Sequence, residues 1–278
     1  MNATATASVI FTPDYAAIKE KQNAAWSSGN YAKIGATLQI VGESLAEAMD
    51  LAPDSRVLDV AAGNGNATLA FARRWCNVVS TDYVESLLAS GRKRSDAEAL
   101  DVKFEIADAE NLPYSGGDFD AVVSTFGIMF APDQQKVAGE LIRVCRPKGR
   151  IGLANWTPDG FIGNLFKTLG GHVAPPAGVL SPALWGRKDW VEETFGGVSS
   201  SLDYRLKNFV FRYRSPEHFM DFFRTYYGPV HKAFQALEIS QQDALRSDIL
   251  ALVHRFNSAT DGSMRVAAEY AEIIIDRK

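Results

Sequence analysis

The sequence predicts an α/β protein built on a doubly wound, mostly parallel sheet of seven strands with added helical cover. Between residues 57 and 156, apolar runs rich in β-branched residues alternate with amphipathic stretches of helical period. The connections between them are short, as in successive β-α-β units. The runs are apolar on both faces, as a sheet covered by helices on both sides requires. Two more strands are expected late in the chain.

Five strands and three helices make up the central part of this prediction. The strands are expected at 56–61, 77–82, 102–108, 119–126 and 150–156. The helices are expected at 67–75, 84–98 and 134–145. The last helix ends before RPKG, where a proline followed by a glycine stops it.

The flanking regions differ from this centre. Before residue 57, IGATLQIVGESLAEAMDLA carries apolar side chains near helical period, which predicts a helix. Residues 204–213 alternate like a strand, and 267–278 are expected to form the last strand. Between these two strands, a helix is expected to begin at Ser215 with Pro216 in its first position.

Composition and charge exclude several classes of protein. The 278 residues are 46% hydrophobic and 22% charged, the balance of an ordinary globular protein. The net charge of −4 is too small for disorder and has the wrong sign for a nucleic-acid surface. Cys76 and Cys145 form neither a zinc-binding nor a disulfide pattern, so no metal is expected. With no signal peptide or apolar membrane span, the sequence predicts a cytoplasmic protein.

The stretch VLDVAAGNGNATLA joins the first expected strand to the first expected helix through a turn of small residues. Such turns bind dinucleotides, nucleoside phosphates and S-adenosylmethionine. Gly63 and Gly65 are followed by Thr68, where a dinucleotide fold has its third glycine. No lysine follows, as a P-loop would need. Phosphate-bearing ligands are therefore disfavoured.

Two carboxylates follow the next two strands. Asp82 ends the second strand, 19 residues after Gly63, where it can accept hydrogen bonds from both ribose hydroxyls of an adenosine. Asp108 follows the third strand and can recognise an adenine amino group, with Glu110 as an alternative. The carboxyl ends of parallel strands meet at one edge of a sheet, so these groups are expected to share one crevice.

Four motifs occur together in order: VLDVAAGNGN, STDYVESLL, IADAENLPYSGGDFDAVVS and ELIRVCRPKGRIGLANW. In this order and spacing they resemble the motifs of class I S-adenosylmethionine-dependent methyltransferases. They most resemble the small-molecule group that includes the ubiquinone/menaquinone-biosynthesis C-methyltransferases. The resemblance covers residues 55–156 and implies S-adenosylmethionine as cofactor.

The resemblance also implies a role for each matching residue. The methionine moiety would lie against Asp59, Ala61 and Gly63, in the turn that includes Gly65. The ribose would bind Asp82. The adenine would contact Tyr83, Asp108 and Ala109. Thr125 and Phe126 would border the methionine amino group and the reacting methyl. Tyr31, with Trp26 and Ile34, falls in a segment that folds over the cofactor in this family. Ala61 stands where the family often has glycine, a substitution that costs little if its φ is negative.

The whole chain is expected to be one methyltransferase domain. Residues 1–54 would form a helical cover, 55–156 the cofactor-binding core, and 157–278 the substrate cover and last strands. Within the last part, residues 160–197 are rich in glycine and proline and are expected to form a mobile lid.

The expected acceptor is a small, partly apolar molecule. Ser124–Gly127 reads STFG and lacks the Asn/Asp-Pro-Pro-Tyr/Phe signature common in enzymes that methylate exocyclic amines of nucleic acids. No catalytic base is identified, because the histidines (His172, His218, His231 and His254) are scattered and have no visible carboxylate partner.

The oligomeric state is left undetermined. Two alternatives remain: a cofactor-binding protein without methylating activity, and a nicotinamide-dependent oxidoreductase, which Thr68 and the lack of a Tyr-x-x-x-Lys pair disfavour.

Overall fold

A computed structural model describes residues 13–278, whose strands form one seven-stranded sheet in the order β3-β2-β1-β4-β5-β7-β6. The first five strands are parallel, and β7 is antiparallel to both β5 and β6. The strands are β1 (Arg56–Val60), β2 (Asn77–Asp82), β3 (Val102–Ile106), β4 (Phe119–Thr125), β5 (Cys145–Trp156), β6 (Ser199–Tyr213) and β7 (Met264–Arg277). The predicted fold class is confirmed.

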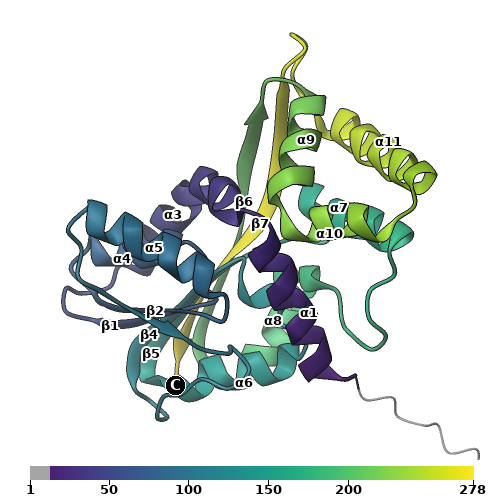
Figure 1. Cartoon of the computed structure of the whole chain (residues 1–278). Helices are drawn as coiled ribbons and strands as arrows, with labels where there is room; N and C mark the ends of the chain where they lie inside the picture. The colour runs from purple at the N-terminus through teal and green to yellow at the C-terminus, as the bar shows by residue number, and fades with distance from the viewer. Residues whose placement is uncertain (1–12) are drawn as a thin grey trace, which may run out of the picture.

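Helices cover both faces of this sheet (Figure 1). On one face lie α3 (Gln39–Met49), α4 (Asn66–Ala72) and α5 (Glu85–Ala97), and on the other α6 (Gln134–Val144) and α8 (Lys188–Phe195). Beside the β6–β7 end lie α7 (Phe161–His172), α9 (Pro216–Tyr226), α10 (Gly228–Ala236) and α11 (Ile239–Phe256). Two further helices, α1 (Tyr15–Ser28) and α2 (Tyr31–Gly35), precede α3.

Burial on both faces explains why the central strands are largely apolar. In β1, Val57 joins a cluster with Leu45 and Phe71 on the α3–α4 side. Leu58 and Val60 belong to the other, larger cluster. Because successive side chains of a strand point to opposite faces, a strand between two helical layers needs apolar residues at most positions, and the buried Asp59 of β1 is hydrogen-bonded by Thr68.

The C-terminal third extends the sheet instead of forming a separate unit. Ser215 caps α9 by accepting a hydrogen bond from the backbone of His218, and Pro216 takes the first helical position as expected. In Figure 1, β6 and β7 extend beyond the rest of the sheet, with α9 and α11 beside them. This part therefore shares the core of the first five strands.

Residues 160–197 form α7, a 3-10 helix η3 (Pro182–Gly186) and α8. Trp185 and Phe195, from η3 and α8, are fully buried in the larger core cluster. The helical parts of the segment therefore contribute to the core, because their aromatic side chains supply apolar area that is buried there.

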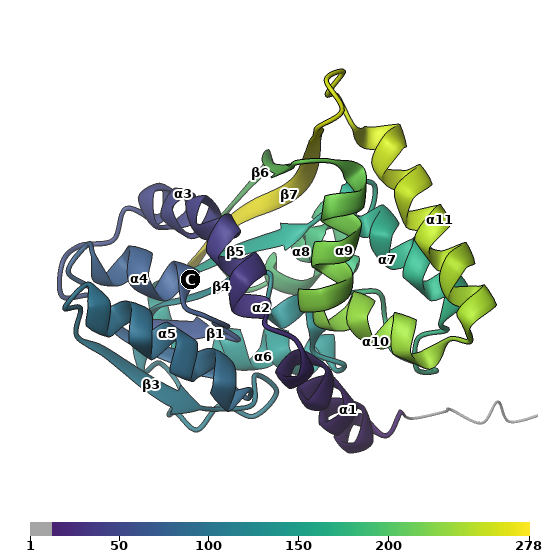
Figure 2. The same cartoon turned by 45° about the horizontal axis from the view of Figure 1, so that its top comes forward.

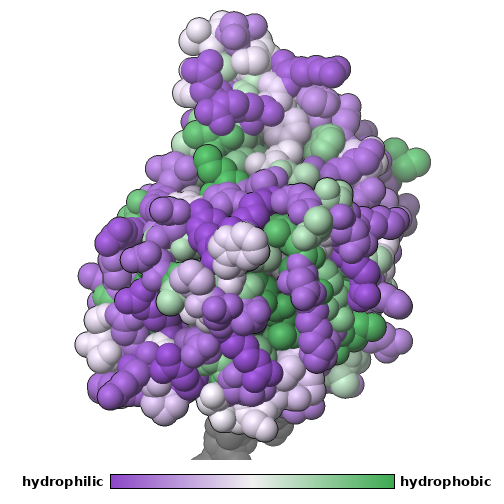
Figure 3. Space-filling view, turned by 90° about the vertical axis from the view of Figure 1, so that its left-hand side faces the viewer, coloured by the Kyte–Doolittle hydropathy of each residue, from purple (hydrophilic) through white to green (hydrophobic). Residues whose placement is uncertain are grey.

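The side of the molecule on the left in Figure 1 is viewed directly in Figure 3, where hydrophilic side chains prevail and hydrophobic ones form smaller areas between them. None of the helices within residues 13–278 has the length and apolar character to cross a membrane. Within the same residues, no group of three His, Cys, Asp or Glu side chains is placed to hold a metal ion.

Candidate active site

A cavity of about 930 Å³, partly open to solvent, lies at the carboxyl ends of β1 to β4. This is the edge of a parallel sheet where ligands bind, because the turns after the strands diverge there. Nine of the eleven residues predicted for the cofactor line it: Tyr31, Ala61, Gly63, Asp82, Tyr83, Asp108, Ala109, Thr125 and Phe126. Asp59 and Gly65 do not.

The turn after β1 adopts left-handed backbone conformations at three positions. Gly63 has a φ of +57° and Gly65 a φ of +83°. Ala61 has a φ of +52°, whereas alanine would cost little here only if its φ were negative. A left-handed alanine costs about 1 kcal/mol or more relative to glycine. A Cβ added to Gly63 would point toward Tyr31, 3.7 Å from its ring, so the space between these two residues is narrow.

Asp59 lies behind this turn and not at its surface. It is fully buried, and its Oδ2 accepts hydrogen bonds from the backbone N–H of Thr68 at 2.8 Å and from the Thr68 hydroxyl at 2.6 Å. Burial raises the pKa of Asp59 to about 7, and the nearby charge of Asp82 adds to the increase. The geometry gives Asp59 the task of fixing the start of α4, in place of the direct contact that the resemblance implied.

Asp82 joins the turn after β1 to the start of α5. Its Oδ2 accepts from the N–H of Gly63 at 2.9 Å, and its Oδ1 accepts from the N–H of Val84 at 2.8 Å. Only 5% of the residue is exposed, and burial raises its pKa to about 6. Each carboxylate oxygen has a second lone pair, so Asp82 can accept two further hydrogen bonds from a ligand.

A carboxylate pair with a lysine between its members lies after β3. Lys19 of α1 donates to Asp108 Oδ2 at 2.6 Å and to Glu110 Oε2 at 2.9 Å. Glu110 is only 2% exposed, and its Oε1 accepts from the N–H of Asp133 at 2.9 Å. Asp108 is the more accessible of the two, so it remains the better placed to contact a ligand.

The cavity is covered by α1 and α2, which lie between the β1–β5 part of the sheet and α9–α10 (Figures 1 and 2). Gln22 donates to the carbonyl of Phe130 at 2.9 Å, and Asn23 donates to the carbonyl of Tyr83 at 2.8 Å. Trp26 meets the rings of Tyr31 and Phe130 edge-on, at centroid distances of 5.4 and 5.0 Å. These contacts hold the cover on the segments that follow β2 and β4, and those of Lys19 hold it on the segment that follows β3.

The cover includes cavity-lining residues that were not predicted from the sequence. Lys19 and Gln22 line the cavity, although no motif singled them out. No residue of 160–197 lines it, so the structure gives this segment no contact with the cavity, and its role as a mobile lid stays a prediction. Lys19 could not be found from the sequence, because its two partners are about 90 positions away along the chain.

The end of β4 forms the most apolar part of the cavity. Phe126 has a φ of +62° and stacks on Trp156, with ring centroids 4.0 Å apart and planes 6° from parallel. Ile128 and Phe130, from the 3-10 helix η2 (Ile128–Phe130), continue this wall. A reacting group at this end would be shielded from water.

None of the four histidines lines the cavity. His172 on α7 does have a carboxylate partner, Asp248 on α11, at 2.7 Å, a pairing invisible in the sequence because the two are 76 residues apart. This pair lies in a separate surface groove between α7 and α11. A histidine base is therefore not part of this site.

The polar groups of the cavity fit an adenosine whose attached chain carries no phosphate, as in S-adenosylmethionine. Asp82 provides acceptors for ribose hydroxyls, and Gly63 leaves room for a chain beside the turn. Lys19 is the only cation among the described residues that line the cavity, and both its contacts are with carboxylates. Nothing among these residues would neutralise a diphosphate.

Comparisons with known proteins agree with this chemistry. Residues 57–149 match a methyltransferase domain family. Over 220 residues the chain is 38% identical to an uncharacterised protein of Mycobacterium tuberculosis, which covers 78% of this chain and 80% of that protein. Over 164 residues it is 34% identical to a demethylmenaquinone methyltransferase of Thermus thermophilus, covering 58% of this chain and 74% of that enzyme.

The fold is also that of a solved phosphoethanolamine N-methyltransferase 2 of Haemonchus contortus, bound to S-adenosylhomocysteine. The TM-score is 0.53 at 17% identity, over 86% of this chain and 52% of that one. The protein is an S-adenosylmethionine-dependent enzyme, and the nicotinamide-dependent alternative is set aside. The chain belongs to the class I S-adenosylmethionine-dependent methyltransferases.

Proposed function

We propose that this enzyme transfers a methyl group to a small, partly apolar molecule bound at the β4 end of the cavity. In this proposal Asp82 accepts from the ribose, Tyr83, Asp108 and Ala109 surround the adenine, and Gly63 with Thr125 borders the methionine moiety. The apolar end formed by Phe126, Ile128 and Phe130 beneath Trp26 is the single observation that carries the proposed acceptor class.

The bound cofactor supplies a methyl group already activated by the positive charge on its sulfur. The protein then contributes mainly alignment and the exclusion of water. Phe126 and Trp156 form a rigid stacked wall on one side, and Trp26 closes the other. This enclosure holds an acceptor in line with the methyl group.

Tyr31 is suited to orient the acceptor by donating a hydrogen bond. Burial raises its pKa above the usual value for tyrosine, and the charge of Asp82 adds to this effect. Its hydroxyl therefore stays protonated near neutral pH and cannot serve as a base. We accordingly propose an acceptor that loses its own proton readily, such as an enol or a phenol.

The similarity to a demethylmenaquinone methyltransferase suggests hydroxylated rings as the first acceptors to test. Purified enzyme would be incubated with methyl-labelled S-adenosylmethionine and a panel of phenols, enolic ring compounds, apolar alcohols and primary amines. We expect transfer to phenols or enols, and a large loss of that transfer in Phe126→Asp, which places a charge in the apolar wall. Transfer only to amines or neutral alcohols would contradict the proposed class.

We also propose that residues 1–54, 55–156 and 157–278 act as one domain in the cytoplasm. A sheet that takes strands from both later parts supports the single domain. Two buried free thiols, Cys76 and Cys145, support a reducing compartment.

A further inference from the structure

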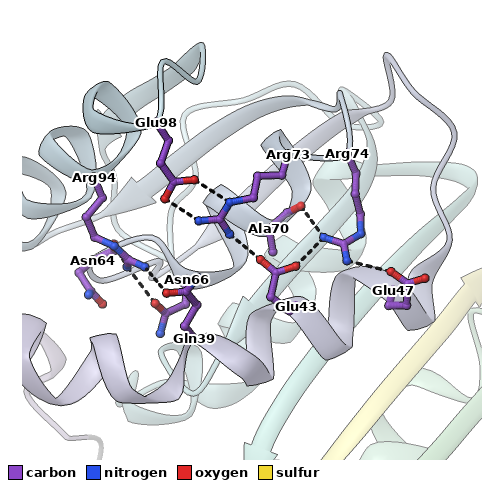
Figure 4. Close-up of polar contacts among 10 residues, drawn as sticks. All are labelled: Gln39, Glu43, Glu47, Asn64, Asn66, Ala70, Arg73, Arg74, Arg94 and Glu98. Carbon is purple, nitrogen blue, oxygen red and sulfur yellow. Dashed lines mark hydrogen bonds and ion pairs between the residues drawn. The ribbon is translucent and has the colours of Figure 1, made fainter.

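A polar network joins α3, α4 and α5 on the outer face of the sheet (Figure 4). Arg73, just beyond the end of α4, contacts Glu43 of α3 and Glu98, just beyond the end of α5. Arg74 contacts Glu43 and Glu47, both on α3. These pairs tie the helices to one another and do not reach the cavity.

One member of the network behaves differently, because it contacts the turn after β1. Arg94 of α5 donates from Nη1 to the backbone carbonyl of Asn64 at 2.7 Å and to Asn66 Oδ1 at 2.9 Å. Its Nη2 lies 3.5 Å from Gln39 Oε1 at the start of α3. Figure 4 shows these three partners grouped around its guanidinium group. Asn64 directly follows Gly63, so Arg94 holds the backbone of the predicted cofactor turn from behind.

The same contact continues to the cover of the cavity. The amide nitrogen of Asn66 donates to the carbonyl of Gly35, the last residue of α2, at 2.7 Å. A Cβ added to Gly35 would lie 2.3 Å from Asn64 Oδ1, so α2 packs directly on the turn. Tyr31 begins α2 and stands over Gly63. Asn66 therefore links the two walls between which the methionine moiety is proposed to lie.

We propose that Arg94 is a positioning residue for cofactor binding, acting through Asn66 to set the gap between Gly63 and Tyr31. The inference rests on the proposed assignment of this cavity to the cofactor. Arg94 itself does not line the cavity. Asn66 is only 8% exposed, and both ends of its amide are engaged by this link. Without Arg94, the amide of Asn66 keeps only its hydrogen bond to Gly35, so the turn and α2 are no longer tied to α5 through the same side chain.

The test compares Arg94→Met with Arg73→Met by calorimetric titration with S-adenosylhomocysteine, alongside thermal unfolding. Both variants remove a networked arginine, but only Arg94 contacts the turn. We expect Arg94→Met to weaken binding about 5- to 30-fold, the range of coupling between linked groups. Arg73→Met should lower the unfolding temperature and leave the affinity unchanged.

Two further variants separate positioning from general stability. Arg94→Lys keeps a cationic donor and should recover part of the affinity that Arg94→Met loses. If Arg94 only stabilised the fold, the two variants would bind equally well when their stabilities are equal. Asn66→Ala should weaken binding as Arg94→Met does, and the double variant should lose little more, because both break one link. In steady-state assays the loss should raise KM for S-adenosylmethionine more than it lowers kcat.

Each outcome decides one question. Failure of the wild-type protein to bind S-adenosylhomocysteine would overturn the cofactor assignment of the cavity. Normal wild-type binding with equal affinity in Arg94→Met, or an equal loss in Arg73→Met, would overturn the positioning role alone. Additive losses from Arg94→Met and Asn66→Ala would show that they act separately, contrary to the inference.

Discussion

The two sides of the cavity are built by different means. Its floor consists of the turns at the carboxyl ends of β1 to β4 (residues 61–66, 82–84, 107–110 and 125–128), which the hydrogen-bonded parallel sheet holds in place. Its roof consists of α1 and α2, held on the floor by side-chain contacts such as those of Lys19, Gln22 and Asn23.

Because of this difference, the cavity can keep a fixed binding surface and still open to admit a ligand. Each roof contact contributes about 1 kcal/mol, so the roof can open locally at a fraction of the cost of unfolding the sheet. The floor has no such freedom, because moving Gly63 or Asp82 disturbs the strands that precede them. We therefore expect floor mutations to act on affinity and roof mutations to act on opening.

The largest expected effect is at Gly63. Gly63→Leu should abolish measurable S-adenosylmethionine binding, because its side chain would fill the space toward Tyr31. Gly262→Leu is the matched control: Gly262 also has a positive φ, of +82°, but a Cβ there meets nothing within 4 Å. It should lose stability through the same backbone strain and bind normally. Binding by a folded Gly63→Leu protein in titration calorimetry would show that the floor does not contact the cofactor.

Asp82→Ala should weaken cofactor binding by about 1.5–3 kcal/mol, the value of hydrogen bonds to a charged group. The carboxylate also holds the backbone of Gly63 and Val84, so part of the loss reflects a looser floor. Calorimetry gives the affinity, and circular dichroism checks that the fold is retained. Equal affinities for the two proteins would remove Asp82 from the site.

The pH dependence of binding should follow Asp82. Burial raises its pKa to about 6, and ribose hydroxyls donate best to the ionised form, so affinity should rise about tenfold between pH 5 and pH 7. Asp82→Asn should flatten this profile. Stability of the unbound protein should change in the opposite direction. A raised carboxyl pKa favours the folded state at low pH, and that contribution is lost as pH rises through about 6. A wild-type affinity independent of pH would contradict the assignment.

The smallest effect is expected in the roof. Lys19→Met removes both ion pairs and should cost about 1 kcal/mol of local stability, seen as faster amide hydrogen exchange in α1 than in α4. Lys21→Met, on the exposed side of the same helix, should leave exchange unchanged. High salt should narrow the difference between wild type and Lys19→Met. Unchanged exchange in Lys19→Met would mean that packing of Trp26 alone holds the roof.

The sequence is sufficient for most of the floor because local rules govern it. The expected strands and helices between 56 and 156 agree with the structure to within a few residues at most of their ends, since alternating period and turn residues act over short distances. The largest difference between prediction and structure is at β5, which begins at Cys145 and not at residue 150. The predicted cavity residues follow from a simple consequence of topology, that parallel strands end at one edge.

Backbone geometry could not be predicted in the same way. The left-handed conformations of Ala61 and Phe126 contradict what their side chains favour. They persist because the neighbouring strands fix both ends of each turn. A Cβ at Gly127 would lie 2.0 Å from the carbonyl of Ala61, which shows how closely the two turns pack.

Periodicity and turn residues in the sequence were enough to predict the fold, the small-residue turn after β1 and the carboxylates that line the floor of the cavity. Only the folded structure shows that Lys19 and Gln22 line the cavity, that the helices of residues 160–197 pack into the core, that Asp59 supports α4, and that Arg94 contacts the turn. The reason is the separation along the chain between interacting residues. Periodicity and turn chemistry depend on sequence neighbours, whereas Lys19 contacts Asp108, and Arg94 contacts Asn64, only after separate segments pack together.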